Sequence, residues 1–159
     1  MSVNSISLGR LAVQYVLYYV LMLLAFAAIV WALATYANFT SSNSAMGVVI
    51  PMVAAMQAGQ YYFTRTGQRP ASGLSWRAAL IFTVIAMILP ITLAVLLILG
   101  AGTDMAIPGM PYSVSREDQQ IIAIILGVFA LLFLLIHRWF FGMGARQAEK
   151  LALKRQKQA

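Results

Sequence analysis

The sequence contains no cysteine, one histidine (His137) and only four acidic residues among 159. The missing cysteines exclude disulfides, thiolate nucleophiles and cysteine-bound metals, and a single histidine is too few for an HExxH metal site within one chain. The sequence also lacks a GxSxG nucleophile motif, a phosphate-binding P-loop and a dinucleotide-binding glycine motif. No nucleophile–base pair is visible. We therefore predict that the protein is not an enzyme and that it requires no cofactor and no metal.

Charge is scarce along the whole chain. Only 9% of residues are charged and 62% are apolar, whereas an ordinary soluble domain is roughly 25% charged. Four apolar runs lie near residues 11–34, 45–63, 76–99 and 119–141, and each is close to the roughly 20 residues that cross a bilayer as a helix. The sequence therefore predicts an all-α fold: a four-helix transmembrane bundle that forms one membrane domain over residues 1–159 and ends in a basic tail, 142–159.

The basic residues predict the orientation of these spans. The connection after the first run has no charge, and the connection after the third carries Arg116 against three acidic residues. The other ten of the eleven Lys and Arg residues fall on the opposite side, so the positive-inside rule predicts that both termini are cytoplasmic. Gly142-Met143-Gly144 permits a bend before the tail, which we interpret as a solvated helix or as a segment that docks on anionic lipids of the cytoplasmic leaflet. Nothing beside the charge could read bases, so we predict no nucleic-acid partner.

Tyrosines and small residues recur at helical spacing within the runs. Tyr15, Tyr18 and Tyr19 lie near the predicted cytoplasmic end of the first run, where we expect an interfacial aromatic belt. Small residues four positions apart permit close helix approach, either within a bundle or between copies. These pairs are Ala28/Ala32, Ala54/Ala58 and Ala55/Gly59.

Polar side chains gather toward the predicted cytoplasmic ends of the runs. The amides and the imidazole would form interhelical hydrogen bonds that fix the packing, because unsatisfied polar groups are costly in lipid. Alternatively, the arginines and Gln60 would bind a phosphate, either of an anionic lipid headgroup or of an anionic solute. The candidate cluster consists of Gln14, Gln57, Gln60, Arg65, Arg69, Arg77 and His137.

Three stretches carry a resemblance to a known family. They are Ala58-Gly59-Gln60-Tyr61, Arg65-Thr66-Gly67-Gln68-Arg69-Pro70 and Trp76-Arg77-Ala78-Ala79. This order resembles the signature between the second and third helices of an uncharacterised family of small four-helix bacterial inner-membrane proteins, and the closing segment 138–146 is similar to the end of that family. In the family an acidic residue often precedes the tryptophan, whereas Leu74 and Ser75 stand there in this chain. The resemblance implies a bacterial inner-membrane location and no particular activity.

Two functional classes follow from these features. The first is a non-catalytic accessory or assembly subunit that packs against a larger membrane complex or against its own copies. The alternative is a small oligomeric transporter or channel for a small solute, with a path near Gln14, Gln57, Gln60 and Pro90. A lipid-active enzyme at the cytoplasmic face is the least supported class, because the chain shows no nucleophile beside a base.

Overall fold

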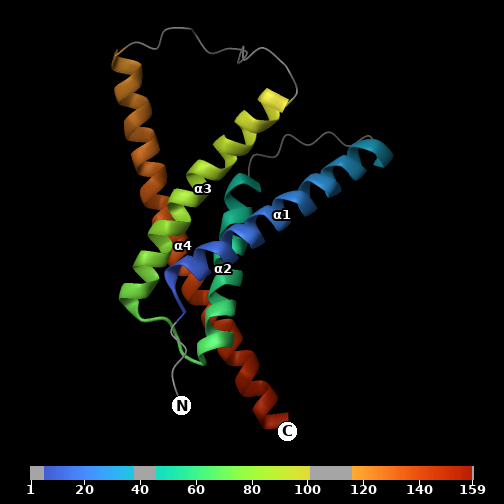
Figure 1. The fold of residues 1–159 in the computed structure, drawn as a ribbon, viewed down its shortest axis with the longest axis vertical. Helices are drawn as coiled ribbons and strands as arrows, with labels where there is room; N and C mark the ends of the chain where they lie inside the picture. The colour runs from blue at the N-terminus through green and yellow to red at the C-terminus, as the bar shows by residue number, and fades with distance from the viewer. Residues whose placement is uncertain (1–5, 38–45, 101–115, 159) are drawn as a thin grey trace.

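The computed structural model describes residues 6–37, 46–100 and 116–158, and within them the chain forms four α-helices (Figure 1). The predicted all-α fold is confirmed at this level. The two connections predicted on the outer side, 38–45 and 101–115, lie outside the described residues. The helices are α1 (Leu8–Ala37), α2 (Met46–Thr66), α3 (Ser72–Gly100) and α4 (Arg116–Gln158).

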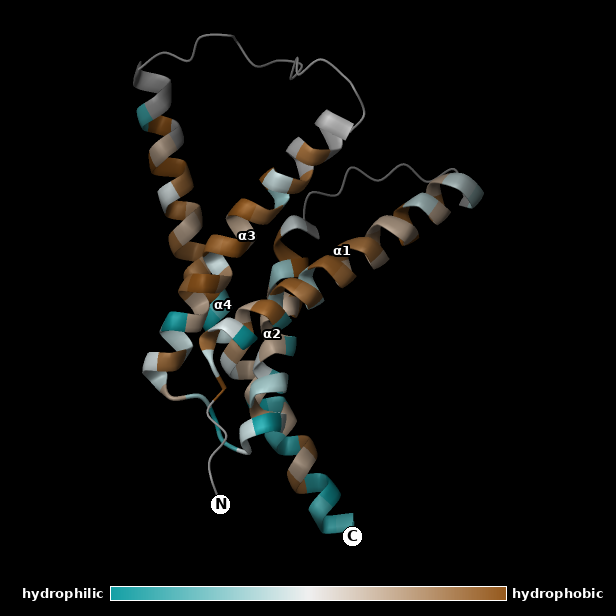
Figure 2. Cartoon of the chain, in the orientation of Figure 1, coloured by the Kyte–Doolittle hydropathy of each residue, from teal (hydrophilic) through white to brown (hydrophobic). Residues whose placement is uncertain are grey.

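Three of the helices are long and apolar enough to cross a membrane. The qualifying segments are Leu8–Tyr36, Ser72–Leu93 and Ala123–Gln158. Helix α2, which the sequence predicts as a further span, does not qualify, because Gln57, Gln60 and Arg65 dilute the apolar residues of a helix only 21 residues long. Figure 2 shows hydrophobic colouring over the upper parts of α1, α3 and α4 and hydrophilic colouring toward the C-terminus of α4.

The helices converge in the lower half of the molecule and diverge above it (Figure 1). The buried core lies where they converge, with Tyr15 of α1, Phe82 of α3 and Phe141 of α4 almost fully inaccessible. The aromatic rings of Tyr15 and Phe82 are stacked with their centroids 4.3 Å apart. Above the core, apolar side chains such as Ile91 and Leu131 are about two-thirds exposed (66% and 63%). The molecule therefore combines one packed end with three spread apolar helices.

Helices α2 and α4 approach each other so closely that backbone meets backbone. The predicted small-residue face of α2 is confirmed, because Ala54, Ala55 and Ala58 are completely buried. A Cβ atom on Gly59 would overlap the carbonyl oxygen of Phe141, and one on Gly144 would overlap the carbonyl oxygen of Met56. Only glycine fits at these two positions of the crossing.

This crossing changes the interpretation of the C-terminal segment. The bend that Gly142-Met143-Gly144 would permit does not form, and α4 continues as one helix of 43 residues. Gly144 instead provides the contact with α2, and Ala145 and Ala148 are buried beyond it. The first part of the segment predicted as a tail therefore belongs to the packed end of the molecule.

The tyrosines of α1 do not form the expected interfacial belt. Tyr15 and Tyr19 are buried (0% and 3% exposed), because they lie on the face of α1 that is turned to the core, where Tyr15 stacks on Phe82 of α3 and bonds His137 of α4. The Ala28/Ala32 pair lies higher on α1, where Ala28 is exposed. Among the described residues, the Ala28/Ala32 pair therefore does not form a close helix contact like that of the small residues on α2.

Candidate functional site

The predicted polar cluster divides into separate places in the structure. His137 lies in the buried core, whereas Gln60, Arg65 and Arg69 lie at the lower end of α2 and in the connection to α3. Gln14 lines a surface cavity beside Arg10 and Tyr61. Gln57 is half-buried on α2, and Arg77 is exposed on α3. The seven residues therefore do not form a single site.

His137 joins three helices through its two ring nitrogens. Its Nε2 lies 3.0 Å from the hydroxyl oxygen of Tyr15 on α1, and its Nδ1 lies 3.0 Å from the hydroxyl oxygen of Thr83 on α3. In a neutral imidazole one nitrogen donates a hydrogen bond and the other accepts one, and either hydroxyl can complement either role. All three groups are buried. The predicted interhelical hydrogen bonding is therefore present for His137.

Two polar contacts link α4 to the lower part of α2 and to the α2–α3 connection. The amide nitrogen of Gln60 lies 3.2 Å from the amide oxygen of Gln147. The guanidinium of Arg69 donates to the carboxylate of Glu149, with Nε 2.7 Å and Nη2 2.6 Å from the same oxygen. Gly67, at a φ of 67°, reverses the chain after α2 and so brings Arg69 beside α4. These contacts fix the connection against the lower part of α4.

We expect the Arg69–Glu149 pair to contribute little to stability. The Arg69 side chain is 60% exposed, and exposed ion pairs are worth about 0–1 kcal/mol because water screens them. Replacing Arg69 with glutamine should therefore lower the free energy of unfolding by less than about 1 kcal/mol. Urea titration in detergent, followed by circular dichroism, measures this change, and a much larger loss would show that the pair is screened less than its exposure implies.

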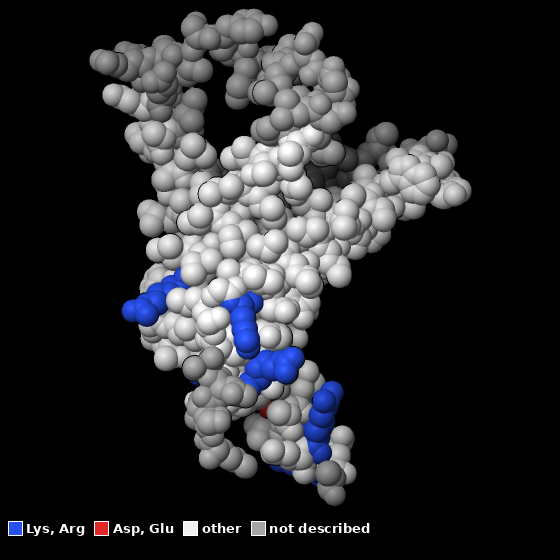
Figure 3. Space-filling model, in the orientation of Figure 1, with Lys and Arg blue, Asp and Glu red and all other residues white. Residues whose placement is uncertain are grey.

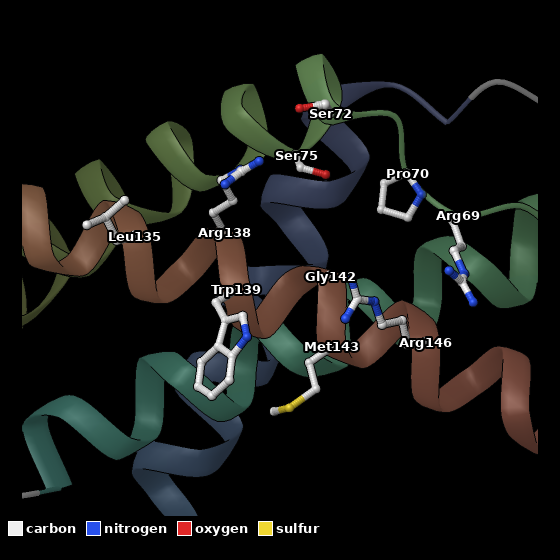
Figure 4. A pocket seen from close by; sticks show the side chains of 10 residues that line it. All are labelled: Arg69, Pro70, Ser72, Ser75, Leu135, Arg138, Trp139, Gly142, Met143 and Arg146. Carbon is white, nitrogen blue, oxygen red and sulfur yellow. The ribbon is translucent and has the colours of Figure 1, made fainter.

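A cavity of about 480 Å³ lies between the start of α3 and α4 (Figure 4). In Figure 4, Arg138 and Arg146 project from α4 on the side of the α3 N-terminus, where Ser72 and Ser75 lie. Arg69 and Pro70 border the cavity from the α2–α3 connection. The complete lining is Arg69, Pro70, Ser72, Ser75, Leu135, Arg138, Trp139, Gly142, Met143 and Arg146.

Among the side chains that the structure describes, a carboxylate pairs with Arg69 of the cavity but none pairs with Arg138 or Arg146. Glu149 is the only acidic residue among those whose side chains are described, and it already pairs with Arg69. Arg138 lies over the ring of Trp76, with Cζ 4.3 Å from the ring centroid. Its Nε atom is buried and has no hydrogen-bond acceptor among the described residues. Chemically, this arrangement suits an anion.

Sequence reasoning did not find Arg138 and Arg146 as members of one site. The two residues and Gly142 are spaced i, i+4 and i+8, which places them on one face of an uninterrupted helix. Because the sequence predicted a bend at residues 142–144, it placed Arg146 in the tail, apart from Arg138 in the last span. Arg77, which the sequence grouped with the other arginines, is exposed and does not line the cavity.

Comparison of the chain with protein-family models, with curated proteins and with solved structures found no match. The resemblance to small bacterial inner-membrane proteins therefore stays a prediction, and function has to be argued from the geometry of this chain.

Proposed function

We propose that this chain is a multi-pass protein of a bacterial inner membrane, with four spans and both termini in the cytoplasm. Three helices of sufficient length and hydropathy support this proposal. Helix α2, at 21 residues, is also as long as the roughly 20 residues that a span needs. On the face in view, Figure 3 shows the Lys and Arg side chains over the lower half of the molecule, the end at which α1 begins and α4 ends in Figure 1. Positive charge at one end favours the cytoplasmic assignment of that end.

The absence of cysteine makes this orientation testable by labelling. We expect a single cysteine introduced as Gln158→Cys to react with a membrane-impermeant maleimide only after the cells are opened. A cysteine introduced as Ser42→Cys, in the connection between α1 and α2, should react in intact cells. The unmodified chain is the blank in both measurements. Labelling of the Gln158 position in intact cells would contradict the proposed orientation.

Within the membrane, we propose that the protein is a non-catalytic accessory or assembly subunit that packs against a larger membrane complex. The divergence of α1, α3 and α4 is the observation that supports this function. On α1 an open apolar face carries Val13, Leu17, Leu21 and Leu24, each of which is more than half exposed. Because the three helices point in different directions, a two-fold contact with one second copy would leave apolar faces uncovered. Several helices of a larger assembly would cover them better.

The positions of the polar residues support the alternative function, a small transporter or channel, less well than the accessory role. Gln14 and Gln60 line separate surface cavities, one at the start of α1 and one between α2 and the end of α4. Pro90 is exposed on α3, away from the buried core. These three residues therefore do not outline the common path that the sequence suggested.

The accessory role predicts a stoichiometric partner. In mild detergent we expect native mass spectrometry to find one additional membrane protein in a fixed ratio, and Leu17→Ala/Leu24→Ala on the apolar face of α1 should release it. The matched control is Leu151→Ala/Leu153→Ala, which shortens two exposed leucines near the C-terminus. Masses that are only multiples of this chain, or solute flux through liposomes that contain only this protein, would overturn the accessory role.

A further inference from the structure

We propose that the cavity between α3 and α4 binds the phosphate of an anionic phospholipid, held by Arg138, Arg146 and the first turn of α3. The inference rests on the proposed orientation, which places this end of the molecule at the cytoplasmic leaflet. Labelling of the Gln158 position tests that orientation separately. The inference does not depend on whether the protein is an accessory subunit.

Charge is the first argument for a phosphate. Arg138 and Arg146 line the same cavity, and the only ion pair among the described side chains is that of Arg69 with Glu149. Two like charges in one partly enclosed space repel each other, so an anion between them lowers the energy of both. Arg138 also stacks its guanidinium on the ring of Trp76, with Cζ 4.3 Å from the ring centroid, and this contact holds the charge at the cavity.

The start of α3 is the second argument, and it is independent of the arginines. Ser72 opens the helix and lines the cavity together with Ser75. The backbone N–H of Ser75 already donates to the carbonyl of Ala71. The N–H groups of Ser72, Gly73 and Leu74 come earlier in the first turn, where intrahelical acceptors are missing and the helix dipole favours negative charge. The phosphate would therefore meet arginines on one side and a helix N-terminus on the other.

The apolar rim indicates that the phosphate belongs to a lipid and not to a soluble anion. Leu135 and Trp139 also line the cavity, and both are more than half exposed on α4. Leu135 lies toward the apolar part of the helix, one turn before Trp139, and tryptophan is the residue typical of the level of lipid headgroups. Acyl chains attached to the phosphate could follow this surface, whereas an inorganic anion would gain nothing from it.

Two variants test the site without removing a core contact. Ser72→Glu places a negative charge at the cavity, and Arg146→Gln removes a positive one. Ser72 and Arg146 are both exposed, so both variants should fold. A glutamate in the first turn of α3 should even favour the helix. The matched controls are Gln156→Glu and Lys154→Gln, which make the same charge changes on exposed positions outside the cavity.

The measurement is native mass spectrometry of the full-length protein, delipidated and then titrated with phosphatidylglycerol or with phosphatidylcholine. We expect phosphatidylglycerol to bind about tenfold more weakly to each cavity variant than to the natural chain. The two controls should bind it like the natural chain, and phosphatidylcholine should show no such dependence. Equal binding by cavity variants and controls would overturn the proposal. So would displacement of the lipid by millimolar inorganic phosphate, because the site would then serve a soluble anion.

Discussion

Replacing Gly144 with alanine is expected to destabilise the protein strongly, whereas the same replacement at Gly142 is expected to be harmless. A Cβ atom at position 144 overlaps the backbone carbonyl of Met56, and a backbone atom cannot move aside by rotating a side chain. Helices α2 and α4 would have to separate, so the buried faces around Ala55 and Ala145 would lose contact. We expect a loss of about 3 kcal/mol, the upper end of the usual cost of overpacking.

Gly142→Ala is the matched control, because it makes the same chemical change two residues away on the same helix. A Cβ atom there meets nothing within 4 Å, and alanine favours a helix over glycine by about 0.5–1 kcal/mol. Thermal unfolding in detergent should therefore place the melting temperature of the Gly144 variant well below that of the natural chain, and that of the Gly142 variant at or above it. Equal melting temperatures for the two variants would contradict the close backbone contact between α2 and α4.

The second large effect is expected at His137, whose replacement with leucine leaves two buried hydroxyl groups without a partner. The hydroxyls of Tyr15 and Thr83 each bond one nitrogen of this ring. Interhelical hydrogen bonds in membrane proteins are worth about 0.6–1.7 kcal/mol each. A buried polar group that loses its partner also keeps its cost of desolvation. We therefore expect His137→Leu to lower the free energy of unfolding by about 2–3 kcal/mol.

A triple variant distinguishes this explanation from simple loss of packing. Adding Tyr15→Phe and Thr83→Val to His137→Leu removes the two unsatisfied hydroxyls, and replacing all partners with apolar groups of similar shape costs far less than removing one. The triple variant should therefore be more stable than His137→Leu alone. Thr92→Val serves as the control, because the exposed Thr92 hydroxyl donates only to the Ile88 carbonyl of its own helix. A triple variant less stable than the single one would contradict the hydrogen-bonded core.

The sequence alone predicted the helices well because their signals are local. Apolar runs of membrane-spanning length, separated by connections rich in charge or in turn-forming residues, define α1, α3 and α4. The small residues Ala54, Ala55 and Ala58 indicated where another helix would approach α2 closely. Their partner was not predictable, because a small-residue face can pack within the chain or against another copy. Only the structure shows that Gly144 completes this contact.

The errors arose where a residue type has two common roles. Tyrosines near the end of an apolar run are usually interfacial, but Tyr15 and Tyr19 are buried because their face of α1 meets Phe82 and His137. Glycines beside a basic segment often permit a bend, but Gly144 allows a helix crossing. In both cases the role of the residue depends on a contacting residue that is far away in the sequence. The periodicity of one segment does not reveal which distant residue it contacts.

The uninterrupted course of α4 has a mechanical consequence. From the crossing at Gly144, about 42 Å of helix extends to Arg116 and about 21 Å extends to Gln158, at 1.5 Å per residue. An unbroken helix carries a tilt of the long arm into the short arm in the opposite direction, and the contacts of α4 with α2 and its following connection, from Phe141 to Glu149, oppose that tilt. We therefore expect that a partner which tilts the apolar end of α4 also displaces the lysines near its C-terminus.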